Sequence, residues 1–209
     1  MVLRYSQPND SPDDQPWLEA KWLKKNIPGL LFGREVRYLY ETANRVGPGR
    51  YADLGTFQGL STGAISMGIQ NYEVDAKLWT FDTFEGTGVR AKFITEEGTL
   101  EAVHSRLKEL DLLGPITFCP GKFSDSVKRY QDFKFDFIFV DGSHDYKSVR
   151  EDFDNWSPLL NVGGEMAFHD SNIKSPNKEV WRLMEELPDL GDWEKVAEER
   201  TLTAWIKKS

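Results

Sequence analysis

The stretch Tyr51-Ala52-Asp53-Leu54-Gly55-Thr56-Phe57-Gln58-Gly59 decides how the rest of the chain is interpreted. A short apolar run ends at Asp53, glycines follow at positions 55 and 59, and a helix-like segment begins at Leu60. Glycine lets a backbone approach a ligand closely, and the free N–H groups at the start of a helix face that ligand. The stretch therefore predicts a strand, a tight turn and a helix that seat a nucleoside-like ligand in an open α/β sheet.

The position of the acid indicates which kind of nucleoside fits. The glycine spacing differs from the dinucleotide pattern G-x-G-x-x-G, because Leu60-Ser61-Thr62 supplies no third glycine. A carboxylate before Gly55 would repel a pyrophosphate by about 4 kcal/mol at an intermediate dielectric, and would attract a cation. S-adenosylmethionine carries an ammonium and a sulfonium but no phosphate, so it is the expected cofactor. The cofactor contacts expected here are Asp53, Gly55, Thr56, Gly59 and Ser61.

A second acid supports a nucleoside site. Lys77–Phe81 has the pattern of a short strand and ends on Asp82, with Thr83 next to it. An acid at the end of the second strand of such folds accepts hydrogen bonds from both ribose hydroxyls. Either acid alone is better explained as a turn residue or a helix cap. Together, Asp53 and Asp82 favour cofactor binding, with Thr83 as a further contact.

Composition and charge restrict the class of protein. The chain has 209 residues, 39% of them hydrophobic, which is enough for one well-buried core. We expect a single domain at residues 17–209, preceded by a flexible lead-in at residues 1–16 that holds three prolines and three aspartates. The net charge of −8 disfavours nucleic acid as a partner.

Cysteine content and hydropathy indicate in which cellular compartment the protein is expected. Cys119 is the single cysteine and has no partner for an internal disulfide. No stretch approaches the ~20 apolar residues of a membrane span, and the first residues lack the pattern of a signal peptide. These features predict a cytoplasmic protein with no membrane partner.

Apolar periodicity predicts alternating strands and helices, and so a parallel sheet covered on both faces. Two helices are expected before the first strand, at Trp17–Lys25 and Gly33–Val46. The expected strands are Tyr51–Leu54, Leu78–Phe81, Ile116–Cys119, Phe135–Val140 and Glu165–Phe168. The later helices are expected at Leu60–Ile69, Glu96–Leu110, Ser124–Tyr130, Tyr146–Leu160 and Asn177–Leu187. Two alternating runs, Trp193–Ala197 and Leu202–Ile206, predict a closing hairpin.

Four segments at predicted strand ends, residues 53–62, 81–86, 136–146 and 163–170, occur in an order that resembles the class I S-adenosylmethionine-dependent methyltransferases. Within that class they are most similar to the small-molecule O-methyltransferases of the macrocin, rhamnosyl and cephalosporin-tailoring type. The resemblance covers most of the chain from residue 33 onward. It implies a Rossmann-like, doubly wound seven-stranded sheet, mostly parallel with an antiparallel C-terminal strand. It also implies cofactor contacts at Gly121, Lys122 and Asp141, and a tendency to self-associate.

Methyl transfer to a hydroxyl requires removal of its proton, by a general base or by a divalent cation. Asp141 and Asp170 follow neighbouring predicted strands, and they resemble the Mg²⁺ site of the family. The family has an Asp or Asn directly after the second acid, whereas this chain has Ser171 and then Asn172. The alternative is that the two acids cap their own turns.

His144 is the expected general base. It lies three residues after Asp141, on the loop over the expected crevice, and histidine accepts a proton readily near neutral pH. Asp145 beside it is the expected carboxylate partner, and His169 is expected to orient or pack. The expected catalytic residues are thus His144 and Asp141. The alternative is a loop histidine that bonds its own turn.

The expected function is therefore O-methylation of a small-molecule hydroxyl, in a secondary metabolite or a sugar. The absence of an Asn-Pro-Pro-Tyr type signature and of a Pro-Cys nucleophile favours oxygen over nitrogen or carbon as the acceptor. Two other classes share parts of this pattern. They are a non-catalytic nucleoside-binding protein and, with less support from the glycine spacing, an NAD-dependent oxidoreductase.

Overall fold

A seven-stranded sheet forms the centre of the protein in the computed structural model, which describes residues 15–72, 75–85 and 99–209. The strand order is β3-β2-β1-β4-β5-β7-β6. The strands are β1 Gly49–Leu54, β2 Ala76–Asp82, β3 Ile116–Pro120, β4 Phe135–Val140, β5 Leu160–Phe168, β6 Trp193–Glu199 and β7 Leu202–Lys207.

The strand directions confirm the predicted sheet. Strands β3, β2, β1, β4 and β5 pair in parallel with their neighbours, and β7 pairs antiparallel with both β5 and β6. The predicted C-terminal hairpin is present, and its turn contains Arg200 with a φ of 58°. The architecture is the doubly wound α/β sheet that the sequence predicted.

The helices follow the expected alternation. They are α1 Gln15–Asn26, α2 Gly33–Val46, α3 Leu60–Ile69, α4 Leu100–Glu109, α5 Phe123–Ser126, α6 Tyr146–Trp156 and α7 Val180–Glu186. Helix α1 begins within the predicted lead-in, whose first fourteen residues lie outside the described part of the chain. The predicted start of a helix at Glu96 also lies outside it.

Three predicted helices are shorter than expected. Helices α5 and α6 end early, whereas α7 begins at Val180, three positions after the predicted Asn177, and ends one position before the predicted Leu187. The 3-10 turns Val127–Arg129, Ser157–Leu159 and Leu187–Leu190 follow α5, α6 and α7. The last two each have a proline at one of their first two positions, where a missing N–H and a fixed φ end the α-helix. Strand β5 consequently begins at Leu160, five positions before the predicted Glu165.

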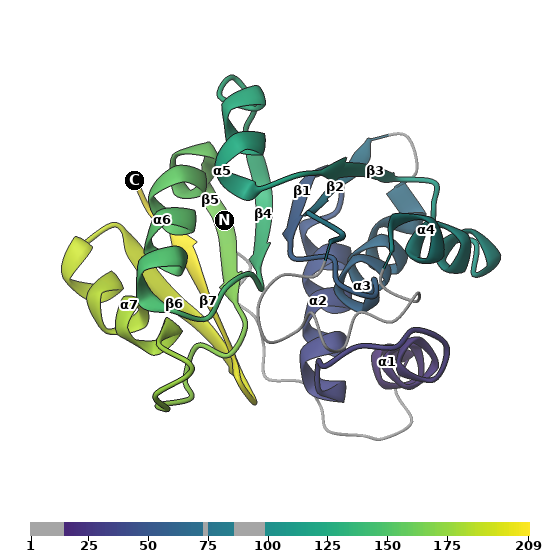
Figure 1. Cartoon of the computed structure of the whole chain (residues 1–209), viewed down its shortest axis with the longest axis horizontal. Helices are drawn as coiled ribbons and strands as arrows, with labels where there is room; N and C mark the ends of the chain where they lie inside the picture. The colour runs from purple at the N-terminus through teal and green to yellow at the C-terminus, as the bar shows by residue number, and fades with distance from the viewer. Residues whose placement is uncertain (1–14, 73–74, 86–98) are drawn as a thin grey trace.

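Apolar side chains cover both faces of the sheet. Tyr51 and Phe137 belong to a cluster with residues of α1, α2, α3 and α4. Ala52 and Ile138, the next residues along the same strands, belong to a second cluster with residues of α6 and α7. Figure 1 shows α1 to α4 together on one side of the molecule and α5 to α7 on the other. Successive residues of β1 and β4 thus contact opposite clusters, as expected of strands that are buried on both faces.

The order in which strands are added to the sheet reverses at β1. Strands β2 and β3 extend from one edge of β1, whereas β4 and β5 extend from the other. Ligands of open α/β sheets bind outside the carboxyl ends of the strands at such a switch point. The site is therefore expected above the ends of β1 and β4.

Candidate active site

Four acidic residues meet at the carboxyl edge of the sheet. Asp53 lies near the end of β1, Asp82 ends β2, and Asp141 and Asp170 follow β4 and β5. These four strands are consecutive neighbours in the order β2-β1-β4-β5. The sequence therefore predicted correctly that the acids follow strands whose ends share one edge.

The turn between β1 and α3 requires glycine at position 55. Gly55 has a φ of 114°, and a Cβ built there would lie 2.2 Å from the carbonyl oxygen of Asp141. Its N–H donates to the carbonyl of Phe81 at 2.9 Å, which ties the turn to β2. Gly59, with a φ of 93°, precedes α3. Gly55 thus holds the turn close to the end of β4, whereas a Cβ on Gly59 would lie 3.0 Å from Val103 of α4.

Asp53 is fully buried beneath that turn. Its Oδ2 accepts hydrogen bonds from Thr62 at 2.5 Å, Ser61 at 3.0 Å and Thr80 at 3.4 Å. Burial raises the pKa of Asp53 to about 7, although the hydrogen bonds from Thr62 and Ser61 lower it. Thr56 is also buried and shares a 2.5 Å hydrogen bond with Thr80. Asp53 and Thr56 thus hold the interior of the turn, and Asp53 fixes the hydroxyl of Ser61.

Asp82 has the position expected of a ribose-binding acid. Its Oδ2 accepts from the backbone N–H of Phe57 and its Oδ1 from that of Phe84, both at 2.9 Å. Phe57 and Phe84 both have positive φ angles, 46° and 55°. Asp82 and Thr83 are partly exposed. The two oriented carboxylate oxygens retain lone pairs that a pair of hydroxyls could use.

The end of β3 lies beside the same acid. Gly121 has a φ of 136°, and its N–H donates to the carbonyl of Asp82 at 2.9 Å. Lys122 is exposed and precedes α5. The following Phe123 packs close to the β4 end, since a Cβ on Gly142 would lie 2.8 Å from its ring. These contacts bring the predicted cofactor contacts Gly121 and Lys122 to the edge that carries Asp82.

His169 is held as a cation between two carboxylates. Its Nδ1 lies 3.3 Å from Asp141 Oδ1, and its Nε2 lies 3.2 Å from Oε2 of the buried Glu35 in α2. Both ring nitrogens can donate only when the imidazole is protonated. Burial alone would lower the pKa of His169, but the charges and hydrogen bonds of Asp141 and Glu35 raise it to about 10. Thr201 donates its hydroxyl to Glu35 at 2.6 Å.

His144 lies between the two acids that follow β4 and β5. Its Nδ1 is 3.0 Å from Asp170 Oδ2 and its Nε2 is 3.7 Å from Asp141 Oδ1. The expected partner Asp145 instead caps α6, where it accepts the N–H of Ser148 at 3.0 Å. A helix N-terminus competes well for an adjacent aspartate, so the neighbour in sequence is used locally.

Asp170 also forms an ion pair with a lysine that the sequence motifs did not indicate. Lys178 Nζ lies 2.7 Å from Asp170 Oδ2. Partial burial would raise the pKa of Asp170, but His144, His169 and Lys178 hold it well below its usual range. The residue has a φ of 52°, a conformation that an aspartate tolerates better than most side chains.

The arrangement does not fit the expected magnesium site. A cation on Asp170 Oδ2 would have to displace the ammonium of Lys178. Ser171 is buried and directs its hydroxyl to a threonine of β7 at 2.8 Å, and the amide of Asn172 donates to a carbonyl of the β6–β7 turn at 2.7 Å. Ser171 therefore points toward β7, and Asn172 is held by the β6–β7 turn. Within residues 15–72, 75–85 and 99–209, no group of three or more His, Cys, Asp or Glu side chains could hold a metal ion.

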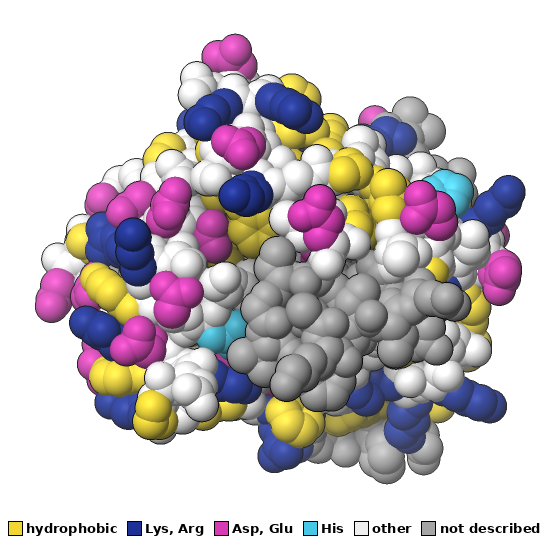
Figure 2. Space-filling view, in the orientation of Figure 1, with side chains coloured by type: hydrophobic (Ala, Val, Ile, Leu, Met, Phe, Trp, Pro, Cys, Tyr) yellow, Lys and Arg dark blue, Asp and Glu magenta, His cyan; other side chains and the backbone are white. Residues whose placement is uncertain are grey.

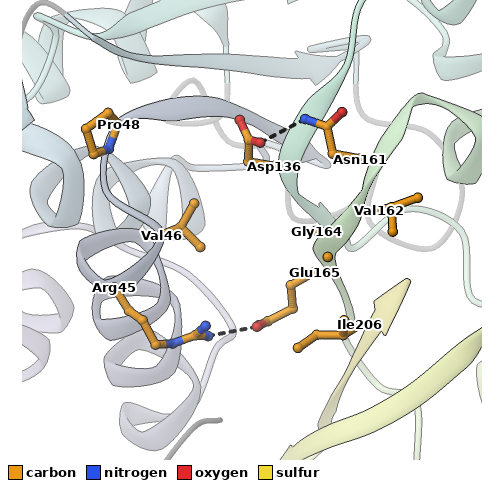
Figure 3. Close-up of a pocket in the computed structure, with 10 residues that line it drawn as sticks. Arg45, Val46, Pro48, Asp136, Asn161, Val162, Gly164, Glu165 and Ile206 are labelled. Carbon is orange, nitrogen blue, oxygen red and sulfur yellow. Dashed lines mark hydrogen bonds and ion pairs between the residues drawn. The ribbon is translucent and has the colours of Figure 1, made fainter. Parts of the chain in front are cut away.

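A separate cavity lies at the opposite edge of the sheet. Its volume is about 360 Å³, and residues near the amino ends of β1, β4 and β5 line it (Figure 3). Its polar groups are paired with one another, Arg45 with Glu165 at 2.7 Å and Asn161 with Asp136 at 2.9 Å. It is therefore remote from the strand-end acids and forms no part of the site.

Among the described helices, none has the length and apolar character needed to span a membrane.

Comparison with known proteins identifies the family. Residues 52–171, more than half of the chain, match the model of a family described as a methyltransferase domain, and the chain belongs to that family. The matched region contains Asp53, Asp82, Asp141, His144 and Asp170. This confirms the class of protein that the sequence motifs predicted.

The chain is also similar to individual proteins, one of them an uncharacterized protein matched in sequence and two of them solved structures matched in fold. Protein y4gI of Sinorhizobium fredii (strain NBRC 101917 / NGR234) is 28% identical over 142 residues, which are 67% of this chain but only 15% of that protein. The fold is similar to that of the O-methyltransferase NovP, with a TM-score of 0.71, 19% identity and coverage of 84% of this chain and 80% of NovP. It is also similar to the O-methyltransferase TomG from Streptomyces achromogenes in complex with SAM, with a TM-score of 0.66, 16% identity and coverage of 100% and 93%.

Proposed function

We propose that the protein is an S-adenosylmethionine-dependent methyltransferase that acts on an oxygen of a small molecule. The observation that carries the proposal is the carboxyl edge of the sheet, where a glycine turn, a partly exposed Asp82 and an imidazole lie above neighbouring strands. The family and the likeness to NovP and TomG, which are named O-methyltransferases, support it.

The residues at this edge fit the cofactor. Asp82 would accept both ribose hydroxyls, and the backbone at Gly55 and Gly121 would allow close approach of the methionine and adenine parts. Ser61 donates its hydroxyl proton to Asp53 and would accept a hydrogen bond from the methionine ammonium. When bound, S-adenosylmethionine supplies an electrophilic methyl group on a sulfonium.

His144 would act as the general base. Its Nδ1 faces Asp170 at 3.0 Å, so this nitrogen would carry the proton of the neutral ring. Nε2 would then accept the proton of the acceptor hydroxyl. His169 would hold Asp141 in place from the interior. His144 would therefore be the base, and His169 would be a cation that positions Asp141.

A small-molecule acceptor is part of the proposal. On the face shown in Figure 2, basic side chains are interspersed with acidic ones, and the net charge is −8. Phosphate backbones are instead bound by continuous basic surfaces. A cytoplasmic location is also proposed, and the single Cys119 supports it.

Calorimetric titration with S-adenosylhomocysteine and then with NAD tests the cofactor. We expect saturable binding of the first and none of the second. Tight binding of NAD with none of S-adenosylhomocysteine would assign the chain to the oxidoreductases. Transfer of a labelled methyl group to a panel of phenols, carboxylic acids, sugars and amines then tests the reaction, and transfer to amines alone would contradict an oxygen acceptor.

A further inference from the structure

Lys178 places a positive charge at the point where the sequence suggested a divalent cation. It lies on the loop between β5 and α7, and its Nζ is 2.7 Å from Asp170 Oδ2. Its side chain is 36% exposed while its ammonium contacts the carboxylate. His144 approaches the same carboxylate oxygen to within 3.0 Å. The ammonium and the proposed base therefore share one anchor.

The loop that carries Lys178 is fixed on both sides of this residue. The N–H of Lys178 donates to the carbonyl of Ser175 at 3.1 Å. The next residue, Glu179, donates its N–H to the carbonyl of His144 at 2.7 Å, and its Oε2 accepts the N–H of Tyr146 at 3.2 Å. The loop after β5 is thus tied to the loop after β4. This coupling holds Lys178 and His144 at a defined separation.

The charges of the cluster are already compensated by the chain itself. Asp141 faces the imidazole of His169 at 3.3 Å, and Asp170 faces Lys178. Ser171, at the position of the expected third ligand, is turned toward β7. A divalent cation would therefore meet a lysine ammonium and a histidine in place of oxygen ligands.

We propose that Lys178 binds the acceptor oxygen in place of a metal ion, and that the acceptor is a phenol. This inference rests on the proposed function, since it concerns the acceptor side of the same site. A single charge stabilises an oxyanion less than a divalent cation does at the same distance. It therefore suits a hydroxyl that ionises readily, such as a phenol with a pKa of about 10, and not an aliphatic alcohol of a sugar.

The reaction balances with these groups alone. The phenol proton passes to Nε2 of His144, and the phenolate remains paired with the ammonium of Lys178. The phenolate oxygen then forms the new bond to the methyl carbon. The bond between this carbon and sulfur breaks, and its electron pair stays on sulfur. Lys178 keeps its proton throughout, so it acts as a fixed charge and hydrogen-bond donor.

The test uses 4-nitrophenol, whose visible absorption reports ionisation, added to the full chain saturated with S-adenosylhomocysteine. The variants are Lys178→Met, which removes the charge at similar length, and Lys178→Arg, which keeps it. Lys128→Met is the matched control, because Lys128 also pairs with an aspartate, Asp125 at 3.1 Å, but lies on the turn after α5. Binding of Mn²⁺ is followed on the same proteins by electron paramagnetic resonance.

We expect the parent, the Lys128→Met variant and the Lys178→Arg variant to bind 4-nitrophenol as the phenolate below the pH at which it ionises in solution. Lys178→Met should lose this signal, and its rate of methyl transfer to phenols in EDTA should fall by about 10². Equal phenolate binding by parent and Lys178→Met would overturn the proposal. Saturable Mn²⁺ binding by the parent, restoration by Mg²⁺ of an activity lost in EDTA, or absence of 4-nitrophenol binding would also overturn it. Failure to bind S-adenosylhomocysteine would instead refute the proposed function, so the two failures are distinguishable.

Discussion

Replacement of Asp53 by asparagine is expected to stabilise the protein at neutral and alkaline pH. Asp53 has no exposed surface, and burial raises its pKa from 3.8 to about 7. An asparagine of the same shape could still accept the hydroxyl bonds from Thr62 and Ser61 through its amide oxygen. It would remove the cost of burying a charge.

The sign follows from proton binding. The folded protein binds the Asp53 proton more tightly than the unfolded chain does, so the free energy of unfolding falls as pH rises from about 4 to about 7. The gap between 3.8 and about 7, at about 1.4 kcal/mol per pH unit, corresponds to about 4 kcal/mol in full. Between about pH 5 and about pH 8, the advantage of the Asp53→Asn variant should grow by about 2 to 3 kcal/mol.

Urea denaturation of parent and variant across this pH range measures the difference. The matched control is Asp125→Asn, because the side chain of Asp125 is 66% exposed. Its difference from the parent should stay nearly constant with pH. A difference between parent and Asp53→Asn that is equally constant would refute the reasoning, since Asp53 would then remain ionised at no cost in the folded state.

Three further predictions concern the site. Asp82→Ala should weaken binding of S-adenosylhomocysteine by about 2 to 4 kcal/mol, because two charge-assisted hydrogen bonds are lost; unchanged affinity by calorimetry would exclude the ribose assignment. Gly55→Val should abolish cofactor binding or folding, as judged by calorimetry and circular dichroism, because its Cβ would lie 2.2 Å from the carbonyl oxygen of Asp141; a variant that folds and binds normally would contradict this. His144→Ala should lower the rate constant of methyl transfer by about 10² to 10⁴ with little change in cofactor affinity, and a parental single-turnover rate would assign proton removal elsewhere.

Much of the fold could be predicted because the signals that define it are local. Periodicity alone predicted Gly33–Val46, Leu60–Ile69 and Phe135–Val140 with the bounds that the structure shows. The requirement for glycine at position 55 follows from a turn of a few residues. The helix predicted at Tyr146–Leu160 was too long. Helix α6 ends at Trp156, because a 3-10 turn that contains a proline follows it.

Only the tertiary structure decided how the site residues are paired. The sequence determined that acids and histidines follow β4 and β5, and so that they share one edge of the sheet. It suggested Asp145 as the partner of His144, but strand order brings Asp170 there, while Asp145 caps its own helix. The contact between His169 and Glu35 joins residues 134 positions apart.

Lys178 is the clearest case of a residue that local pattern could not identify. It lies on a loop whose residues show no helix or strand periodicity. From the sequence alone it would be interpreted as an ordinary surface lysine. Its meeting with Asp170 depends on the path of the loop after β5 and on the backbone bond between Glu179 and His144. Periodicity reports which side of an element is buried, whereas a contact between two loops depends on where the whole sheet places their ends.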